Sequence, residues 1–212
     1  MTNDIDELEE LMPDISLGLK EHFIQYFELI EQYNTRINLV AKSTIPRAGL
    51  KHFSDSYMAL KIIEDSLVKG SPIFDFGSGN GFPGLVAAMM FPEESVILVE
   101  RDQRKAQFLK TAASKLGLDR VEVHPGNVSD LADGSCVNVI SRAMAPLPKF
   151  LLVTRAVMAE GGKAFLFKGD HWSTEFSQVE AQVFDYWEVE LKDAYELPKN
   201  DGTRFVVQCT RI

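Results

Sequence analysis

The sequence predicts an α/β fold: a mostly parallel sheet with an antiparallel C-terminal edge, preceded by an N-terminal helical extension. From residue 73 onward, short apolar runs alternate with helical stretches, which indicates parallel strands covered on both faces. No helical pattern separates the last two apolar runs, so these strands are expected to pair antiparallel. The 212 residues, 45% of them apolar, are enough for one such domain with a short extension.

The helical extension is expected before the alternating pattern begins. Residues 1–15 are acidic and show no sustained period, which is typical of a poorly ordered segment. Large apolar residues recur every three or four positions over residues 16–33, and again over residues 55–67, which predicts two amphipathic helices. A Gly-Ser-Pro break follows, so we divide the chain into an extension of residues 1–70 and a main domain of residues 71–212.

The main domain contains seven apolar runs short enough to be strands. The expected strands are residues 73–76, 96–99, 121–124, 137–140, 163–167, 187–191 and 205–209. The expected helices are residues 84–91, 102–116, 148–158 and 176–184. Gly117 is suited to ending the second of these helices, and the Gly161-Gly162 pair to ending the third.

Several classes of protein are disfavoured by composition. No apolar run approaches the roughly 20 residues that a membrane helix needs. The acidic N-terminus is unlike a secretory signal, and the two cysteines form no spaced framework, so we expect a reducing, cytoplasmic setting. The four histidines are scattered, so no metal site is predicted.

The charge distribution permits a nucleic-acid partner although the net charge is −9. Acidic side chains outnumber basic ones nine to one in residues 1–31 and eight to two in residues 175–201. Between them lie three basic stretches, residues 32–54, 101–115 and 141–155, of which the first and third contain no acid. Such stretches are either solvated helix faces or a positive surface for phosphates.

The most informative motif is the glycine-rich loop from Asp75 to Gly84. It follows the first strand and opens a helix, so its glycines allow the backbone to turn sharply and approach a nucleotide, as in Rossmann-like folds. Glu100 ends the second strand, where a carboxylate can accept hydrogen bonds from both ribose hydroxyls. This geometry suits S-adenosylmethionine and a nicotinamide cofactor alike, and a purely structural glycine turn is a third interpretation.

Two residues of the loop favour S-adenosylmethionine. The carboxylate of Asp75 would repel a pyrophosphate and would favour a cationic amino-acid tail, directly or through the loop. Pro83 removes a backbone N–H from the helix start, where a pyrophosphate would need donors.

A wider set of motifs resembles the ribosomal small-subunit methyltransferase G family, also called glucose-inhibited division protein B. The motifs are Tyr33-Asn34-x-x-Ile37-Asn38-Leu39, His52-x-x-Asp55-Ser56, the glycine loop, Arg104-Lys105-x-x-Phe108-Leu109, Ser141-Arg142-Ala143-x-Ala145-Pro146-Leu147 and Lys168-Gly169. They run in order over residues 33–169. The resemblance implies an S-adenosylmethionine-dependent methyltransferase fold and methylation of guanine N7 in 16S ribosomal RNA, free or in a small-subunit ribonucleoprotein.

The resemblance and the loop chemistry together name the expected site residues. The predicted cofactor contacts are Asp75, Gly77, Gly79, Gly81, Phe82, Glu100, Val128, Ser129 and Arg142. The predicted RNA contacts are Arg36, Asn38, Arg47, His52, Arg104, Lys105 and Lys168. The family often has Asp-Ser where this chain has Glu100-Arg101. No catalytic base is expected, because guanine N7 already carries an in-plane lone pair.

Competing interpretations remain open at this stage. Asp55 or Ser56 could cap a helix, His52 could be packed or solvated, and Lys168 could be a solvated strand end. The alternative functions are a methyltransferase for a protein or small molecule, an NAD(P)-dependent oxidoreductase, and a regulatory module that binds S-adenosylmethionine without catalysis.

Overall fold

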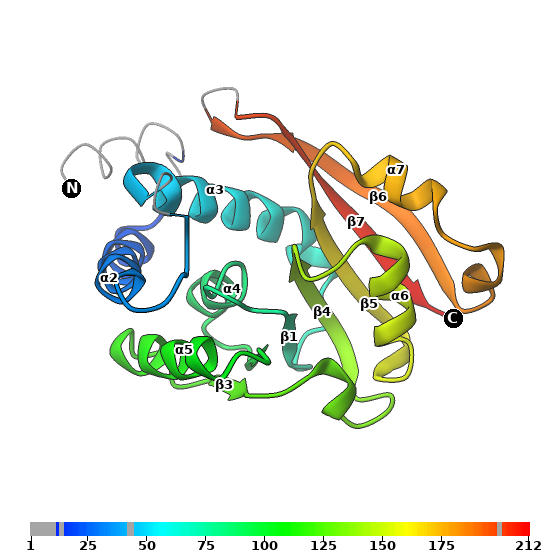
Figure 1. The fold of residues 1–212 in the computed structure, drawn as a ribbon, viewed down its shortest axis with the longest axis horizontal. Coiled ribbons are helices and arrows are strands. Elements are labelled where there is room, and N and C mark those ends of the chain that lie inside the picture. Colours follow the sequence, from blue (N-terminus) through cyan, green and yellow to red (C-terminus); the bar gives the residue numbers. More distant parts are fainter. Residues whose placement is uncertain (1–11, 13–14, 42–44, 199–200) are drawn as a thin grey trace.

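The computed structural model describes residues 12, 15–41, 45–198 and 201–212, with backbone alone for residues 45–50. One seven-stranded sheet of order β3-β2-β1-β4-β5-β7-β6 forms its centre (Figure 1). The strands are β1 Ile73–Phe76, β2 Val96–Val99, β3 Val121–His124, β4 Cys136–Arg142, β5 Met158–Lys168, β6 Trp187–Glu196 and β7 Thr203–Arg211. Strands β1 to β5 are parallel and β7 is antiparallel to β5 and β6, which confirms the predicted sheet.

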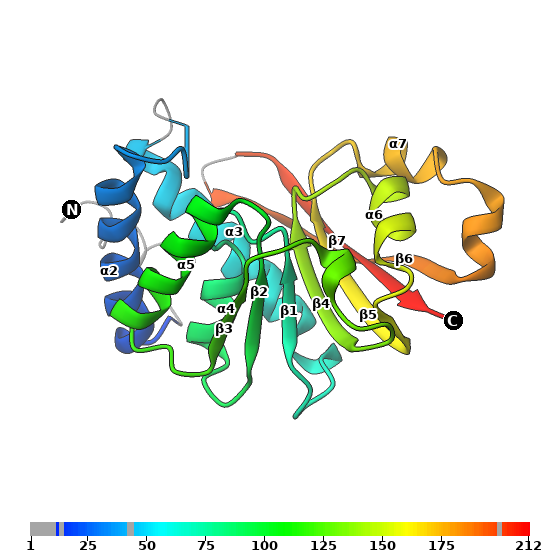
Figure 2. The same ribbon diagram turned by 60° about the horizontal axis from the view of Figure 1, so that its bottom comes forward.

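Helices cover both faces of this sheet, as Figure 2 shows. One face carries α2 (Leu17–Asn34), α3 (Ile45–Ile63), α4 (Gly84–Met90) and α5 (Gln103–Lys115), whose apolar residues share one buried cluster. The other face carries α6 (Leu147–Thr154) and the short α7 (Trp172–Ser177), which pack over a second cluster. Short 3-10 turns lie at Glu64–Ser66, Val128–Asp130 and Ala181–Asp185.

The central strand β1 is buried along its whole length because neighbours cover it on both edges and both faces. Its side chains alternate: Phe74 and Phe76 join the α6 cluster, whereas Ile73 joins the cluster on the α4 side. Asp75 shares the α4 face with Ile73, where its carboxylate meets the N–H of Gly84 at the start of α4. An ionisable residue is therefore built into the middle of the core, directly below the glycine loop.

Helix α3 begins ten residues earlier than the sequence pattern suggests. Pro46 and Gly49 resemble helix breakers, but a proline is tolerated in the first helical turn, where its missing N–H would have no intrahelical partner. The expectation that Asp55 or Ser56 caps a helix is therefore wrong. Asp55 lies inside α3, buried with 6% of its surface exposed.

The linker between α3 and β1 is fastened to the sheet by Asn138 of β4, which is fully buried. The side-chain oxygen of Asn138 accepts a hydrogen bond from the N–H of Val68 at 2.9 Å. Its amide nitrogen donates to the carbonyls of Val68 and Ser71, at 2.9 and 3.2 Å. The division of the chain after residue 70 falls within this fastened linker and stays a prediction.

Two helices differ from expectation in the C-terminal half. The helix predicted for residues 148–158 ends at Thr154, and Met158 already belongs to β5. Gly162 lies inside that strand, at a position that needs a glycine because a Cβ would come within 2.8 Å of two backbone carbonyls. The helix predicted for residues 176–184 is replaced by α7 and a 3-10 turn at Ala181–Asp185. Among the described residues, no helix is long and apolar enough to cross a membrane.

Candidate cofactor and RNA site

A pocket of about 760 Å³ opens where the parallel strands end, next to the glycine loop. This edge is where open α/β sheets bind their ligands, and the volume is in the range of small-molecule sites. The predicted cofactor residues that line it are Gly77, Gly79, Phe82, Glu100, Val128, Ser129 and Arg142. They come from the ends of β1, β2 and β4 and from the turn after β3.

The glycine loop needs its glycines for different reasons. Gly77 has φ +75°, and a Cβ there would lie 3.0 Å from the side chain of Met144 on the opposite wall. Gly79 has φ +53°, a Cβ there would meet only the Gly77 carbonyl and Glu100 at ordinary contact distances of 3.7 and 4.0 Å, and its backbone lines the pocket. The pocket floor is thus bare backbone that a ligand can approach closely.

Glu100 is held in a fixed orientation at the end of β2. One carboxylate oxygen accepts from the N–H of Gly79 at 2.7 Å, and the other from the N–H of Asp102 at 2.8 Å. A carboxylate has about four acceptor sites, so two remain for a ligand's hydroxyl groups. The glutamate at this position therefore presents a carboxylate to the pocket despite its extra methylene.

Asp75 and Gly81, both predicted cofactor contacts, lie behind the loop and do not line the pocket. Asp75 is fully buried, and its Oδ2 accepts from the N–H of Gly84 at 3.1 Å. Its Oδ1 has no partner among the described residues, and burial raises the pKa of this carboxyl to about 7. Gly81 faces Tyr26, whose hydroxyl donates to the carbonyl of Asn80. Both residues support the loop from below.

Of the N–H groups between Gly77 and Gly84, all but that of Asn80 donate to an acceptor within the described residues. The N–H groups of Gly77 and Ser78 donate to one carbonyl, and those of Gly79, Gly81, Phe82 and Gly84 have other internal acceptors. Pro83 has none to offer. A pyrophosphate binds at such loops through free backbone N–H groups at the helix start. The arrangement therefore fits S-adenosylmethionine, which has no phosphate, better than a dinucleotide.

Arg142 ends β4 and forms part of the pocket wall. Its Nη1 donates to Asp55 Oδ2 at 2.9 Å and lies 3.2 Å from His52 Nδ1, and its guanidinium is 5.7 Å from the Phe82 ring centre. Burial, with the Arg142 charge, lowers the pKa of His52 to about 4, so the ring is neutral near pH 7. His52 lies behind Arg142 and does not line the pocket, although the sequence predicts an RNA contact there.

The wall opposite the glycine loop is formed by Ala143, Met144 and Ala145, in the loop that leads from β4 to α6. Ala143 has φ +57°, a strained conformation for a residue with a side chain. Lys168 donates to the carbonyl of Ala145 at 3.0 Å and to Glu175 at 2.8 Å, and the same Glu175 oxygen accepts from the N–H of Leu147. Lys168, predicted to contact RNA, is instead a half-buried, ion-paired support of this loop.

The remaining predicted RNA residues, apart from Arg47, lie around α5 and the turn after α2. The exposed Arg104 donates to the carbonyl of the exposed Arg36 at 2.6 Å, and Asn38 is exposed nearby in the sequence. Lys105 reaches the pocket rim. Arg47 belongs to α3, but its side chain lies outside the described residues.

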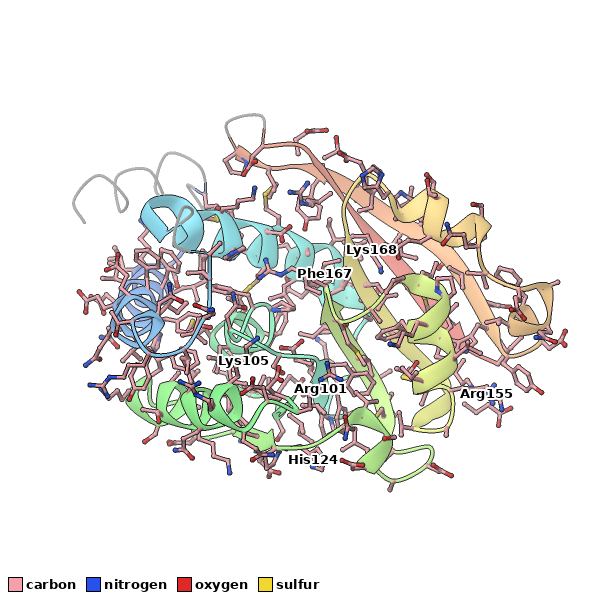
Figure 3. The ribbon with its side chains drawn as sticks, in the orientation of Figure 1. Arg101, Lys105, His124, Arg155, Phe167 and Lys168 are labelled. Atoms are coloured by element: carbon pink, nitrogen blue, oxygen red, sulfur yellow. The ribbon has the colours of Figure 1, made fainter. Side chains whose placement is uncertain are left out.

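Two further cations at the rim are absent from the predicted contacts. Arg101 follows β2 and Lys149 lies near the start of α6, and both line the pocket. Both belong to the basic stretches visible in the sequence, but the sequence does not say which members of a stretch face the site. In Figure 3, Arg155 of the same stretch as Lys149 lies far from Arg101 and Lys105.

A metal site is not part of this arrangement within the described ranges. No three His, Cys, Asp or Glu residues gather there in a way that could hold an ion. Cys136 and Cys209 are both buried and unpaired.

Comparisons with known proteins agree with this geometry. A family described as rRNA small subunit methyltransferase G matches residues 19–194. A Bdellovibrio bacteriovorus protein named ribosomal RNA small subunit methyltransferase G 3 is 35% identical, over 90% of this chain and 86% of its own. A relative from Paracoccus denitrificans with the same family name is also 35% identical, over 81% of this chain and 86% of its own.

Solved structures show the same fold at lower identity. A SAM-dependent methyltransferase from Aquifex aeolicus superposes with a TM-score of 0.58 at 16% identity, over 80% of this chain and 96% of its own. The tRNA (m1A58) methyltransferase of Aquifex aeolicus gives a TM-score of 0.56 at 15% identity, over 76% of this chain and 68% of its own. Family match, relatives and fold agree, and the chain belongs to the rRNA small subunit methyltransferase G family.

Proposed function

We propose that this protein transfers a methyl group from S-adenosylmethionine to N7 of a guanine in 16S ribosomal RNA. The observation that carries the proposal is the pocket at the strand ends: it offers the Glu100 carboxylate, while most of the loop's backbone donors are already engaged. Membership of the methyltransferase G family supports the reaction and the RNA substrate.

Different pocket residues would contact different parts of the cofactor. Glu100 would accept hydrogen bonds from the ribose, and Val128 and Ser129 would lie against the adenine. Gly77 and Phe82 would line the path to the methyl donor, with Arg142 closing the wall. When bound, the cofactor supplies an electrophilic methyl group on a positively charged sulfur.

The protein's own contribution is alignment. Guanine N7 is unprotonated at neutral pH, so its attack needs no base, and correct orientation alone can be worth roughly 7–11 kcal/mol. His52 lies behind Arg142, and Asp75 lies below the loop, so neither is placed to take a proton from a bound base.

A flat pH profile is the expected outcome of this mechanism. Single-turnover rates at saturating S-adenosylmethionine should stay level from about pH 6 to about pH 9, because no essential proton transfer accompanies methyl transfer. Quenched-flow measurement with labelled cofactor tests this. A steep limb that disappears on mutation of one side chain would contradict it.

RNA is expected to cross the pocket mouth. N7 lies in the deep major groove of A-form RNA, so the target guanine must be in a loop or flipped out of its helix. Lys105 and Arg101 on one side, with Lys149 on α6, are placed to hold the adjoining phosphates. Arg36, Asn38 and Arg104 would extend this surface along α5. A cytoplasmic location follows from such a substrate.

Methyl transfer to unmodified ribosomal RNA is the direct test. Purified protein and labelled S-adenosylmethionine are incubated with 16S RNA or with small subunits, and the modified base is mapped. We expect one labelled guanine, with the faster substrate identifying free RNA or the ribonucleoprotein. No label in either substrate would overturn the proposal.

A thermal-shift comparison separates the rival cofactors. S-adenosylhomocysteine at a hundredfold excess over its dissociation constant should stabilise the fold by about 2.7 kcal/mol, whereas NADH should have no effect. The reverse result would favour an oxidoreductase.

A further inference from the structure

A buried polar chain behind Arg142 is not used by the reaction outlined above. The hydroxyl of Tyr195, near the end of β6, donates to Asp55 Oδ1 at 2.7 Å and lies 3.0 Å from the Asp55 carbonyl oxygen. The other carboxylate oxygen, Oδ2, accepts from Arg142 at 2.9 Å. Tyr195 is 8% exposed and Asp55 6%. The two oxygens of one buried carboxylate thus join the C-terminal hairpin to the pocket wall.

The hairpin reaches this position because its end crosses over α3. Strand β6 is at the edge of the sheet, beyond β7, yet Tyr195 and Leu197 are buried in the cluster formed by α2, α3 and α4. A second tie lies just beyond β6, where Lys51 of α3 is 2.5 Å from Asp201. That ion pair is exposed and contributes little energy, whereas the Tyr195–Asp55 contact is buried.

Arg142 has donors to spare for a ligand. Only its Nη1 is engaged, with Asp55 and His52, so Nε and Nη2 have no protein partner among the described residues. A long arginine side chain loses considerable rotamer freedom when it is held in one place. An anchor that fixes the guanidinium in advance reduces the entropy that ligand binding must otherwise overcome.

We propose that Tyr195 is a positioning residue for the cofactor pocket: it fixes the Asp55 carboxylate, which in turn holds the Arg142 guanidinium beside Phe82. This inference rests on the proposed function, in which the pocket takes S-adenosylmethionine. It gives the C-terminal hairpin a part in ligand binding and explains why the His52-x-x-Asp55 motif accompanies Arg142, 87 residues away.

The test is a double-mutant cycle read by calorimetric titration with S-adenosylhomocysteine. Tyr195→Phe keeps the ring and removes the donor, and it should weaken binding about three- to tenfold. In an Arg142→Met background the same change should have no further effect, because the group through which Tyr195 acts is gone. Unfolding midpoints without ligand show whether each variant is folded.

The matched control is Tyr186→Phe. Tyr186 precedes β6, its ring lies between Arg155 and Arg211, and its hydroxyl has no partner within the described residues. Wild-type affinity in Tyr195→Phe, or equal losses with and without Arg142, would overturn the inference and leave the proposed function intact. A wild-type protein that does not bind S-adenosylhomocysteine would instead overturn the proposed function itself.

Discussion

Gly81 stands where two constraints coincide at a single residue. Its φ is +89°, and a Cβ would overlap the Tyr26 hydroxyl and come within 2.7 Å of Leu85. Gly117 is a natural comparison, because its φ is +64° but nothing lies within 4 Å of its missing Cβ. The pair separates the backbone penalty for a side chain from the penalty for crowding.

We therefore predict that Gly81→Ala lowers the free energy of unfolding by about 2–4 kcal/mol and Gly117→Ala by about 1 kcal/mol. The second value is the left-handed backbone penalty alone, and the difference is the cost of moving Tyr26 and Leu85. Urea unfolding of both variants measures it. Equal decreases in the free energy of unfolding would mean that Tyr26 and Leu85 move to accommodate the methyl group without an energetic cost.

Asp75 makes stability depend on pH in an unusual direction for a carboxylate. Its folded pKa is about 7, against an ordinary value of 3.8, because burial disfavours the charged form. The folded state therefore binds more protons between these values, so this contribution is complete below about pH 4 and is lost as the pH rises through about 7.

The expected result appears in a comparison with Asp75→Asn. The variant lacks this titration, so its stability relative to wild type should improve as the pH is raised from 5 to 8. Urea unfolding without ligand at several pH values gives the difference, in which other titrating groups cancel. A difference that is constant with pH would show that Asp75 keeps an ordinary pKa.

Sequence reasoning at this scale identifies residue types well and side-chain surroundings poorly. The carboxylate of Asp75 belongs to the site, but it supports the loop from below because Gly84 supplies the matching N–H. Lys168 looks like a free cation until Glu175, seven residues later, is brought against it. Such pairings depend on how strands and helices come together in space, which a single sequence does not show.

Among the elements, the short helix α7 supports the loop that forms one wall of the pocket. Its Glu175 accepts from Leu147 at the start of α6 and pairs with Lys168, which donates to the Ala145 carbonyl, so it holds the loop that carries the pocket wall. The Lys168 side chain is 11% exposed, so Glu175 replaces much of the water that would otherwise surround its ammonium group. Removing one partner of a shielded ion pair destabilises the fold, because the other charge is left buried without compensation.

We predict that Glu175→Gln lowers the free energy of unfolding by about 1–3 kcal/mol and increases hydrogen exchange at Leu147. Glu188→Gln, an exposed change on β6, should alter neither. Urea unfolding and amide exchange measure the two effects. Unchanged exchange at Leu147 would mean that the loop is held by other contacts.

Element boundaries follow from sequence where the local pattern and the burial agree. The first three strands lie at the predicted residues, because each is a short apolar run between polar turns. The start of α3 and the end of α6 differ from the prediction, because Pro46 is tolerated in the first helical turn and the chain enters β5 at Met158, before Gly161 and Gly162. The contact of Tyr195 with Asp55, 140 residues apart, has no local signal at all.

At the scale of the whole molecule, the parallel strands all point the same way, so their carboxyl ends and their amino ends form two different sides of the protein. Helix α6 runs between them: Lys149 lies near its start at the pocket, and Arg155 follows its end, stacked on Tyr186 at 4.3 Å. The two cations belong to one basic stretch of sequence, yet Lys149 lies at the carboxyl ends of the parallel strands and Arg155 at their amino ends. They form a matched pair for locating the RNA surface.

We predict that Lys149→Gln weakens RNA binding and lowers its logarithmic salt dependence by about 0.7, the value for one phosphate contact on a single strand. Arg155→Gln should change neither quantity. Filter binding at several salt concentrations measures both. If the two variants behaved alike, the RNA would not be confined to the pocket edge.

The hydrogen bonds of the Asn138 amide have a consequence for how the protein unfolds. Asn138 is fully buried in the central sheet and holds Val68 and Ser71, so the exposed linker between the leading helices and the strands is tied to the core. If those helices separated from the sheet, the buried amide of Asn138 would lose its hydrogen-bond partners. We therefore expect the helices and the sheet to unfold together in a single cooperative thermal transition.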